Sequence, residues 1–375
     1  MEEPGLGQRA PRVLVSGLVL DLAQAGVARH GEELLPRAAR LLASAGGKLS
    51  VLAGAAGLSV DLGPEVECIP SSAASHPAWR RARDEGRALR QALRGATAAG
   101  RPFDLVHTSH LPVPAKLPVP FSWLVHDLRR VDRGGFLSRS AGRILMRSAA
   151  RRADAILAVS EFTARRLREV LGVEAQVVPN ACGHFDPLPR RPAAGAPLLH
   201  VGHLEPRKNL RLLIRALSLS PELPDLWLAG AAKNGEDTRL KDLAAATGVL
   251  DRIRFLGAPE DDEIVELYAT CAAVVLPSAY EGFGLTALEA LKAGCPLACS
   301  DIPAHREITA GHAAFFDPGD VGSCARAVLE ALASQPTTEA QTQAERYSWD
   351  DSARLLVTAW GALVPRPVTD PPHSP

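Results

Sequence analysis

The chain has 375 residues, of which 46% are hydrophobic and 22% are charged. That length excludes one ordinary domain and suits two, and the composition is that of a soluble globular protein with a sizeable core. The net charge is zero, but residues 1–190 hold 26 Lys and Arg against 18 Asp and Glu, whereas residues 191–375 hold 16 against 24. This division indicates that one half attracts partners that the other half does not.

The six cysteines form no C-x-x-C pair and have no histidine at the spacing of a zinc site. Most lie among apolar residues, so we expect reduced, buried thiols in a cytoplasmic protein. The first apolar run, residues 13–20, is short and meets Asp21, which is typical of a buried strand rather than a signal peptide or a membrane span. Any membrane contact is therefore expected to be peripheral, on the inner face.

The first predicted domain spans residues 12–186 and follows a loose tail at residues 1–11. A helix is expected around residues 27–45, and short β-rich runs bounded by Pro, Gly or Asp predict strands. The predicted strands are residues 13–18, 49–52, 105–107, 122–125, 155–159 and 176–178.

A linker rich in Pro, Ala and Gly is predicted at residues 187–197, before a second domain at residues 198–345. A helix at residues 346–364 and a disordered, Pro-rich tail at residues 365–375 follow it. The alternation of strands and helices predicts an α/β fold: two Rossmann-like domains with parallel sheets, facing a central cleft that binds ligands. The strands predicted in the second domain are residues 198–201, 226–228, 253–256, 273–276, 296–299 and 313–316.

The most informative motif is PSAYEGFGLTALE at residues 277–289. It follows an apolar strand and leads into a helix, and its two glycines allow the backbone to approach a ligand closely. A glycine turn that opens a helix presents free N–H groups and the positive end of the helix dipole, which together favour phosphate. Glu281 and Glu289 flank the turn, and carboxylates accept hydrogen bonds from sugar and ribose hydroxyls. The alternative is a surface turn with two solvated glutamates.

A second motif, VGHLEPRKN at residues 201–209, also lies where a strand leads into a helix. Arg207 and Lys208 directly precede the predicted helix at residues 209–217, where cations oppose the helix dipole. Their placement is easier to understand if an anion binds there, because Arg and Lys are good phosphate ligands.

With these two motifs, the chain resembles the retaining glycosyltransferases of family 4, which have the GT-B fold. EGFGLTALE matches the family's two glutamates with seven residues between them, and GHLEPRKN matches its diphosphate-binding turn. WLVHDL at residues 123–128 resembles its central His-Asp segment. RYSWDDSARLLVTAWGAL at residues 346–363 resembles its last helix, which crosses back towards the first domain.

The resemblance implies that Arg207 and Lys208 neutralise the diphosphate of a sugar-nucleotide donor and that the glycine turn binds the distal phosphate. It also implies that Glu281 holds hydroxyls of the transferred sugar and Glu289 the nucleotide ribose. The expected donor-binding residues are Arg207, Lys208, Glu281, Gly282, Phe283, Gly284, Leu285 and Glu289.

The expected catalytic residues are His126, Glu281, Arg207 and Lys208. By the resemblance, His126 lies near the reacting centre and contacts the sugar or its glycosidic oxygen. Cations and N–H groups stabilise the negative charge that builds on the leaving diphosphate. On the acceptor side, the family's glycine-rich loop is matched by QAGVARH at residues 24–30, which keeps only Gly26 and Arg29.

No Asp-x-Asp motif is present, and EDDE at residues 260–263 is better suited to a helix N-terminus. His107 and His110 form an H-x-x-H pair without a third ligand spaced nearby, which favours a loop that lines the cleft over a zinc site. We therefore expect a metal-independent enzyme with no cofactor beyond its donor substrate.

The N-terminal half contains two rows of arginines with helical spacing. They are Arg139, Arg143, Arg147 and Arg151 in one row, and Arg80, Arg83, Arg87, Arg90 and Arg94 in the other. Two solvated helices explain the rows, and so does contact with an anionic bilayer that holds a lipid-linked acceptor. Nucleic-acid binding is not expected, because no aromatic residues are interleaved with the arginines.

The combined pattern predicts a hexosyltransferase that moves a sugar from a nucleoside diphosphate, with GDP-mannose favoured, to a hydroxyl of a glycan or a lipid-linked acceptor. Two alternatives stay open: a nucleotide-sugar epimerase on the same fold, and a non-catalytic subunit that binds sugar nucleotides. The four charged motif residues argue against the second alternative, whereas the irregular QAGVARH loop supports it.

Overall fold

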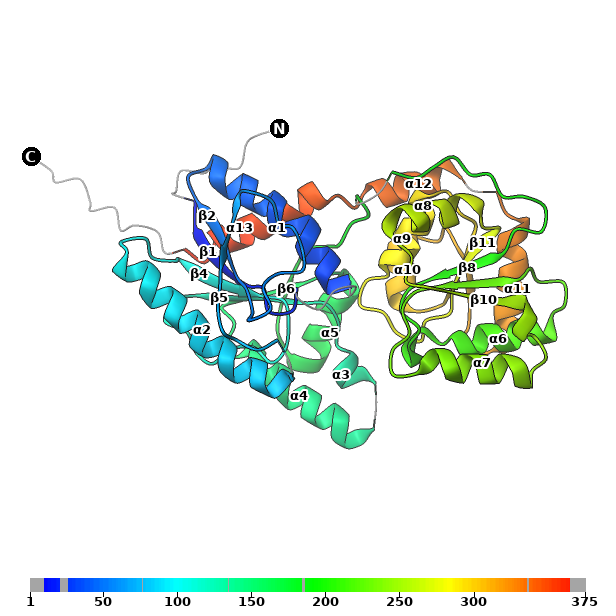
Figure 1. The fold of residues 1–375 in the computed structure, drawn as a ribbon, viewed down its shortest axis with the longest axis horizontal. Coiled ribbons are helices and arrows are strands. Elements are labelled where there is room, and N and C mark those ends of the chain that lie inside the picture. Colours follow the sequence, from blue (N-terminus) through cyan, green and yellow to red (C-terminus); the bar gives the residue numbers. More distant parts are fainter. Residues whose placement is uncertain are drawn as a thin grey trace, which may run out of the picture. The chain divides into compact units, whose positions relative to one another are not determined.

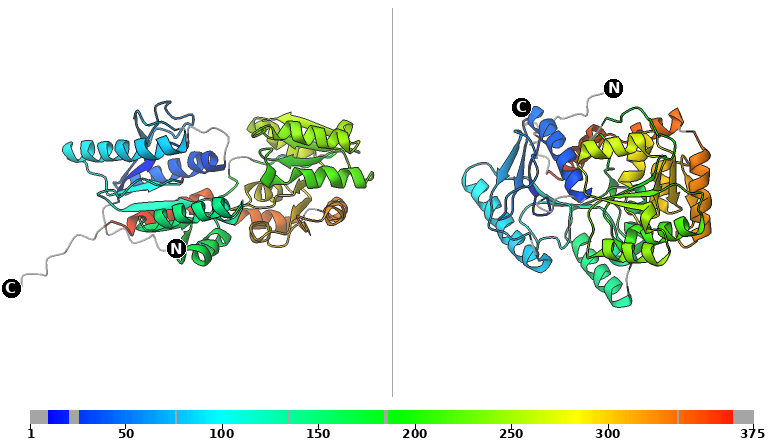
Figure 2. Two further views of the ribbon diagram at one scale, coloured as in Figure 1. Left: turned by 90° about the horizontal axis from the view of Figure 1, so that it is seen from below. Right: turned by 45° about the vertical axis from the view of Figure 1, so that its right-hand side comes forward.

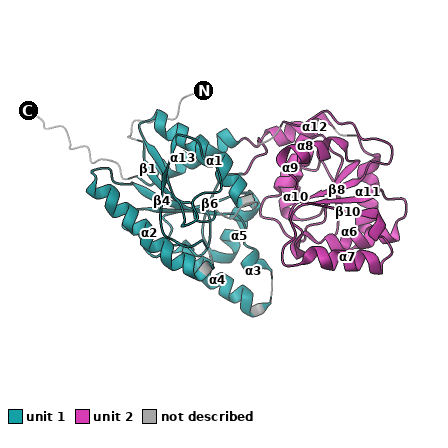
Figure 3. Ribbon diagram, in the orientation of Figure 1, with its two compact units in different colours: residues 1–179, 349–375 teal, residues 180–348 magenta. Residues whose placement is uncertain are grey.

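The computed structural model describes residues 10–20, 26–75, 77–133, 135–183, 186–335 and 337–364. The chain divides into two compact units, residues 1–179 with 349–375 (unit 1) and residues 180–348 (unit 2) (Figure 3). The predicted C-terminal tail and most of the predicted N-terminal tail lie outside the described residues.

Unit 1 is built on a parallel sheet with the strand order β3-β2-β1-β4-β5-β6-β7. The strands are β1 (Arg12–Ser16), β2 (Lys48–Leu52), β3 (Val66–Ile69), β4 (Leu105–Thr108), β5 (Phe121–Val125), β6 (Ala155–Ala158) and β7 (Gln176–Val177). Each predicted strand overlaps an observed one, but β3 has no predicted counterpart. It is an edge strand whose Glu67 and Cys68 are exposed, so it lacks the apolar run that identified the others.

Helices cover both faces of this sheet. On one face, α1 (Gly26–Ser44) and α13 (Trp349–Gly361) lie side by side (Figure 1). The other face carries α2 (Ala78–Ala98), α3 (Arg129–Asp132), α4 (Phe136–Ala150) and α5 (Glu161–Leu171). Side chains from these helices, among them Leu89, Met146 and Leu167, pack with Trp123 of β5 into one apolar core.

Unit 2 contains a second parallel sheet, with the order β10-β9-β8-β11-β12-β13. Its strands are β8 (Leu198–Val201), β9 (Leu226–Ala229), β10 (Ile253–Gly257), β11 (Ala273–Leu276), β12 (Leu297–Ser300) and β13 (Ala314–Phe316). The strands β8 and β11 are neighbours although they lie far apart in the sequence. The carboxyl ends of these two strands therefore lie side by side, which is the arrangement that builds ligand sites in such sheets.

Helices also cover both faces of the unit 2 sheet, and Figure 2 shows them from two further directions. One layer consists of α6 (Leu210–Leu219), α7 (Glu236–Ala246) and α11 (Val321–Ala333). The other layer contains α8 (Asp261–Thr270), α9 (Leu285–Lys292), α10 (Pro303–Thr309) and α12 (Thr338–Glu345). Short 3-10 turns, η1 (Pro206–Lys208) and η2 (Leu250–Arg252), precede α6 and β10.

The boundary between the units differs from the predicted one. Unit 2 begins at Asn180, before the predicted linker at residues 187–197. Part of that segment is fixed to unit 2, because Arg190 donates from Nη2 to the carbonyl oxygen of Cys271 at 2.7 Å, and Arg191 forms an ion pair with Glu266. The second boundary lies at residues 348 and 349, so α13 belongs to unit 1.

Among the described residues, no helix has the length and apolar composition that a membrane span requires.

Candidate functional site

The two sequence motifs form the turns that follow β8 and β11 in unit 2. After β8, Gly202 has a φ of 134°, and a 3-10 turn then carries Arg207 and Lys208. The sequence predicted a helix from residue 209, but α6 begins at Leu210, because Asn209 adopts a left-handed conformation with a φ of 55°. The Asn209 side chain instead donates a hydrogen bond to the carbonyl oxygen of Pro318 at 2.9 Å.

Close backbone packing holds the first turn in place. A Cβ atom on Gly230, which follows β9, would lie 2.1 Å from the carbonyl oxygen of Gly202. Because real Cβ atoms do not approach backbone this closely, only glycine fits at position 230 without displacing the turn. The backbone N–H of Ala279 donates to the carbonyl oxygen of Arg207 at 2.8 Å and links the first turn to the second.

The second turn opens α9, as the sequence predicted. Gly284 is the N-cap residue of α9 and has a φ of 103°, a conformation that favours glycine. A Cβ atom there would lie 3.4 Å from the His305 ring. The turn therefore presents the N-terminus of α9 beside the first turn, where backbone N–H groups and the helix dipole favour an anion.

Glu281 connects the two turns through a cluster of charge-assisted hydrogen bonds. Its Oε2 accepts from Arg207 Nη1 at 2.6 Å, and its Oε1 accepts from Lys208 Nζ at 2.8 Å. Ser278 Oγ donates to the same Oε1 at 2.7 Å, and Glu205 Oε1 lies 2.8 Å from Arg207 Nη2. Both catalytic cations predicted from the sequence thus share the predicted sugar-binding carboxylate as their counter-ion.

Burial opposes ionisation of Glu281, but Lys208 and Arg207 outweigh it and hold the pKa of this carboxyl far below its usual range. Close by, burial lowers the pKa of His200 to about 3, with a further contribution from the Lys208 charge. His200 is therefore neutral, and it is held by a 3.0 Å hydrogen bond between its Nδ1 and the carbonyl oxygen of Val275. The two cations thus keep the Glu281 carboxylate ionised inside a largely buried site.

Glu289 lies within α9, and only 8% of its surface is exposed. Its Oε2 accepts a hydrogen bond from the Tyr268 hydroxyl at 2.8 Å. Burial raises the pKa of Tyr268 well above its usual value, and the Glu289 charge adds to the effect, so the phenol stays protonated as the donor. Glu289 and Glu281 are thus fixed by different partners at the two ends of the motif.

In unit 1, His126 follows β5, as predicted. Its Nε2 is buried without a hydrogen-bond partner among the described residues, and its ring lies edge-on to His30, with 4.9 Å between the centroids. Burial lowers the pKa of His126 well below its ordinary value, and the neighbouring histidines contribute. A neutral imidazole with a free ring nitrogen is suited to exchange a hydrogen bond with an uncharged hydroxyl.

The predicted acceptor-side residues lie at the start of α1. Gly26 is the first residue of that helix, and Arg29 Nη1 lies 3.6 Å from Glu32 Oε2. The preceding residues of the QAGVARH loop, Gln24 and Ala25, lie outside the described residues.

The H-x-x-H pair, with His107 in β4 and His110 just after it, is buried and bonded to protein groups. His107 Nδ1 lies 2.7 Å from Ser122 Oγ, and His110 Nε2 lies 3.1 Å from Glu85 Oε2. Across the part of the chain that the structure describes, no group of three or more His, Cys, Asp or Glu side chains is arranged to hold a metal ion.

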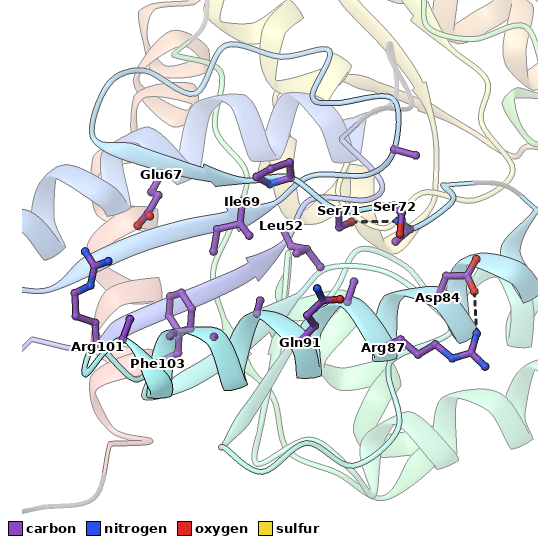
Figure 4. A pocket seen from close by; sticks show the side chains of 18 of the residues that line it. Leu52, Glu67, Ile69, Ser71, Ser72, Asp84, Arg87, Gln91, Arg101 and Phe103 are labelled. Atoms are coloured by element: carbon purple, nitrogen blue, oxygen red, sulfur yellow. Dashed lines mark hydrogen bonds and ion pairs between the residues drawn. The ribbon is translucent and has the colours of Figure 1, made fainter.

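A groove of about 1060 Å³ lies in unit 1 between α2 and the edge of the sheet formed by β2 and β3. Glu67 and Arg101 lie at one end of it, and Asp84 and Arg87 lie at the other (Figure 4). None of the site residues predicted from the sequence lines this groove.

Comparison with known proteins connects these turns to a family. The family model described as "Glycosyl transferases group 1" matches residues 192–348, and the one described as "Glycosyltransferase Family 4" matches residues 26–182. The chain belongs to glycosyltransferase family 4. Both halves of the chain are therefore accounted for by models of glycosyltransferases.

Among curated proteins, the family 4 chain is 30% identical over 234 residues to the O-antigen chain mannosyltransferase B of Escherichia coli. That match covers 56% of this chain and 61% of the relative. The serotype-specific mannosyltransferase WbdA of Escherichia coli is 29% identical over 238 residues, which cover 57% of this chain and 29% of WbdA. The chain thus spans less than two thirds of the length of these relatives.

Solved glycosyltransferase structures share the fold. The sucrose-phosphate synthase of Thermosynechococcus elongatus has a TM-score of 0.74 at 18% identity, and the match covers 94% of this chain and 99% of that one. The Anabaena protein HepE, solved in complex with UDP and glucose, has a TM-score of 0.67 at 19% identity, with 94% and 100% coverage. The family 4 chain therefore has the GT-B fold of two Rossmann-like α/β domains.

Sequence reasoning missed several residues that lie beside the predicted ones within each unit of this family 4 chain. Ser278 lies within the motif and contacts Glu281, but its role depends on a side-chain direction that the sequence does not give. Ser300 donates to the carbonyl oxygen of Ser278 at 2.5 Å, and the backbone carbonyl of Ser300 lies 2.9 Å from His305 Nδ1. His30, at 4% exposure, was not singled out, although it lies in the QAGVARH segment beside His126.

The buried histidines predict how stability depends on pH. His107 and His200 both have a pKa of about 3, lowered chiefly by burial, against an ordinary value of 6.5. Below pH 6.5 the unfolded chain gains protons on these residues that the folded chain does not, so stability falls as the pH falls from 6.5 towards 3. Each histidine should cost up to about 2 kcal/mol between pH 6.5 and 5.

Urea denaturation of His200→Gln at pH 7 and pH 5 measures this contribution. The variant should lose less stability between the two pH values than the unsubstituted chain, and the partly exposed His312→Gln should behave like the unsubstituted chain. If His200→Gln loses as much stability between pH 7 and pH 5 as the unsubstituted chain does, the lowered pKa of His200 does not contribute to this pH dependence.

Proposed function

We propose that the chain is a retaining hexosyltransferase that uses a nucleoside-diphosphate sugar as donor. The observation that carries the proposal is the cluster in which Glu281 bridges Arg207 and Lys208 beside the N-terminus of α9. Two cations and a helix N-terminus suit a diphosphate, and a carboxylate at the same place suits sugar hydroxyls.

The reaction breaks the bond between the anomeric carbon of the sugar and the diphosphate oxygen. Negative charge then builds on the departing diphosphate, where Arg207, Lys208 and the α9 N–H groups stabilise it. The acceptor hydroxyl forms the new bond to the anomeric carbon from the same side, and its proton passes to the departing phosphate. His126 receives a hydrogen bond from the sugar, and Glu289 binds the nucleotide ribose.

We propose GDP-mannose as the favoured donor and a glycan or lipid-linked oligosaccharide as the acceptor. The LEPRKN turn and the likeness to two mannosyltransferases at 30% and 29% identity support the donor. The acceptor class is supported by the name of the first of these relatives, an O-antigen chain mannosyltransferase.

A screen of the full chain against GDP, UDP, ADP and dTDP and their sugars tests the donor. Because a ligand that binds only the folded state raises the melting temperature, GDP and GDP-mannose should each produce a shift. Arg207→Ala and Glu289→Ala should abolish the shift. A shift with another nucleotide in place of GDP would mean that the donor carries that nucleotide. No shift with any of them at millimolar concentration would overturn the proposal.

Two further measurements separate the alternatives. Product analysis by NMR should show that the transferred sugar keeps its anomeric configuration. Incubation without acceptor should leave the sugar nucleotide stereochemically unchanged, since an altered sugar would identify an epimerase. Binding of the donor with no transfer to any glycan acceptor would support a non-catalytic subunit.

A further inference from the structure

The outward side of α4 carries exposed aliphatic side chains. Leu137 and Ile144 are 82% and 70% exposed. They are seven residues apart, about two helical turns, so they lie on the same side of the helix. Large aliphatic side chains gain free energy when they leave water, but these two are not buried by their own unit. This side of α4 is therefore suited to a partner that offers an apolar phase.

The same helix carries three arginines of one row, and the fourth, Arg151, is its C-cap residue. All four residues of the row, Arg139, Arg143, Arg147 and Arg151, are exposed. None of their guanidinium groups forms an ion pair with any other residue in the ranges that the structure describes. The sequence of α4, FLSRSAGRILMRSAA, contains no acidic residue. The positive charge of α4 is thus uncompensated, and Arg147 and Arg151, three and seven residues after Ile144, lie on the same side of the helix as Ile144.

The second row, on α2, is different. Asp84 of α2 lies 3.0 Å from Arg83, 3.6 Å from Arg80 and 3.8 Å from Arg87. Three of its arginines therefore share a carboxylate on their own helix. The two rows have similar helical spacing in the sequence, but only the row on α2 has an acidic partner on its own helix.

We propose that α4 docks on an anionic lipid bilayer through the face formed by Leu137, Ile144, Arg139, Arg143, Arg147 and Arg151, the α4 face. The aliphatic residues enter the boundary between headgroups and acyl chains, while the arginines contact lipid phosphates. A nucleic acid offers the arginines phosphates but offers the aliphatic residues no apolar phase. In Figure 1, α4 forms the lower margin of unit 1. The docking does not depend on the proposed transfer reaction.

Flotation of the full chain with vesicles tests the docking. The chain should float with vesicles that contain phosphatidylglycerol and not with phosphatidylcholine alone. Replacing all four arginines of the α4 face with glutamine should lower the partition coefficient by about 600-fold, since each contributes about fivefold. Leu137→Ser with Ile144→Ser should lower it at least about tenfold, because the insertion is lost.

Arg80, Arg83, Arg87 and Arg94 of α2, all exposed, provide the matched control. Their replacement with glutamine removes the same charge and should leave most of the binding. Equal losses in the two quadruple variants would show a general charge effect and overturn the proposal. Full binding by the serine variant would also overturn it, as would failure of the unsubstituted chain to float with anionic vesicles.

The nucleotide-induced thermal shift, measured in the same variants, checks the fold and keeps the two proposals apart. The α4 variants should keep the shift, since none of these residues lies in the unit 2 site. A chain that shifts with nucleotide but does not float overturns the docking alone. A chain that floats but binds no nucleotide overturns the proposed function alone.

Discussion

Replacement of Glu281 with glutamine should lower kcat for sugar transfer by about 10²- to 10³-fold, the range seen when one preorganised polar group of a transition state is lost. The same change should strengthen the binding of a free nucleoside diphosphate. In the unsubstituted chain the Glu281 carboxylate accepts hydrogen bonds from Lys208 Nζ at 2.8 Å and from Arg207 Nη1 at 2.6 Å. A diphosphate must share or replace these bonds, and a neutral amide competes for the cations less well.

Stability should change in the same variant. Lys208 is 92% buried, and without Glu281 it loses its ion pair, as does one arm of Arg207. Breaking a buried pair by removing one partner costs about 3 kcal/mol. Because a bound diphosphate supplies new negative charge, GDP should raise the melting temperature of Glu281→Gln more than that of the unsubstituted chain.

Calorimetric titration with GDP and an assay of transfer from GDP-mannose measure the two effects. Glu205→Gln is the matched control, because the Glu205 carboxylate also pairs with Arg207 at 2.8 Å, whereas the bonds to Lys208 Nζ and Ser278 Oγ are made by Glu281. The control should keep most of its transfer activity. Unaltered transfer in Glu281→Gln, or an equal loss in both variants, would contradict the role given to Glu281.

Gly230→Ala should produce the largest loss of stability of any alanine substitution discussed. Residue 230 has a φ of 153°, and the new Cβ atom would lie 2.1 Å from the carbonyl oxygen of Gly202. The strained backbone and the displaced neighbour together should cost on the order of 3–5 kcal/mol. Gly202 must move, and it begins the turn that carries Arg207 and Lys208, so the response to GDP should also be lost.

Gly235→Ala separates backbone strain from steric displacement. Gly235 has a φ of 70°, and a Cβ atom there would meet nothing within 4 Å. The control should lose only about 1–2 kcal/mol and keep the GDP response. Urea denaturation followed by circular dichroism, together with the thermal shift, compares the two variants. Similar losses in both would show that the contact with Gly202 is unimportant.

The sequence predicted most of the fold, because buried parallel strands are continuous apolar runs that can be read locally. The edge strand β3 has no such run, since its Glu67 and Cys68 are exposed. The start of unit 2 at Asn180 was also not predicted. A Pro-rich segment reads as a linker, although contacts such as that of Arg190 fix part of it to a domain.

The site was predictable only in part, for a similar reason. The motifs placed Arg207, Lys208 and Glu281 at the ends of strands, but the bond between residues 207 and 281 depends on β8 and β11 being neighbours. That neighbourhood is a property of the strand order and not of either motif. Likewise, the arginine rows of α2 and α4 both have helical spacing. The ion pairs with Asp84 on α2 and the exposed Leu137 and Ile144 on α4 distinguish them.

The position of α13 has a consequence for how the chain folds during synthesis. Trp360 of α13 is fully buried, and its indole N–H donates to Ser122 Oγ of β5 at 3.1 Å. Because α13 is made after all of unit 2, the first half of the chain emerges from the ribosome while one face of its own sheet is covered by α1 but not yet by α13. Unit 2 is continuous in sequence and has all its residues available earlier than unit 1 does. The N-terminal unit therefore completes its fold last, although its synthesis begins first.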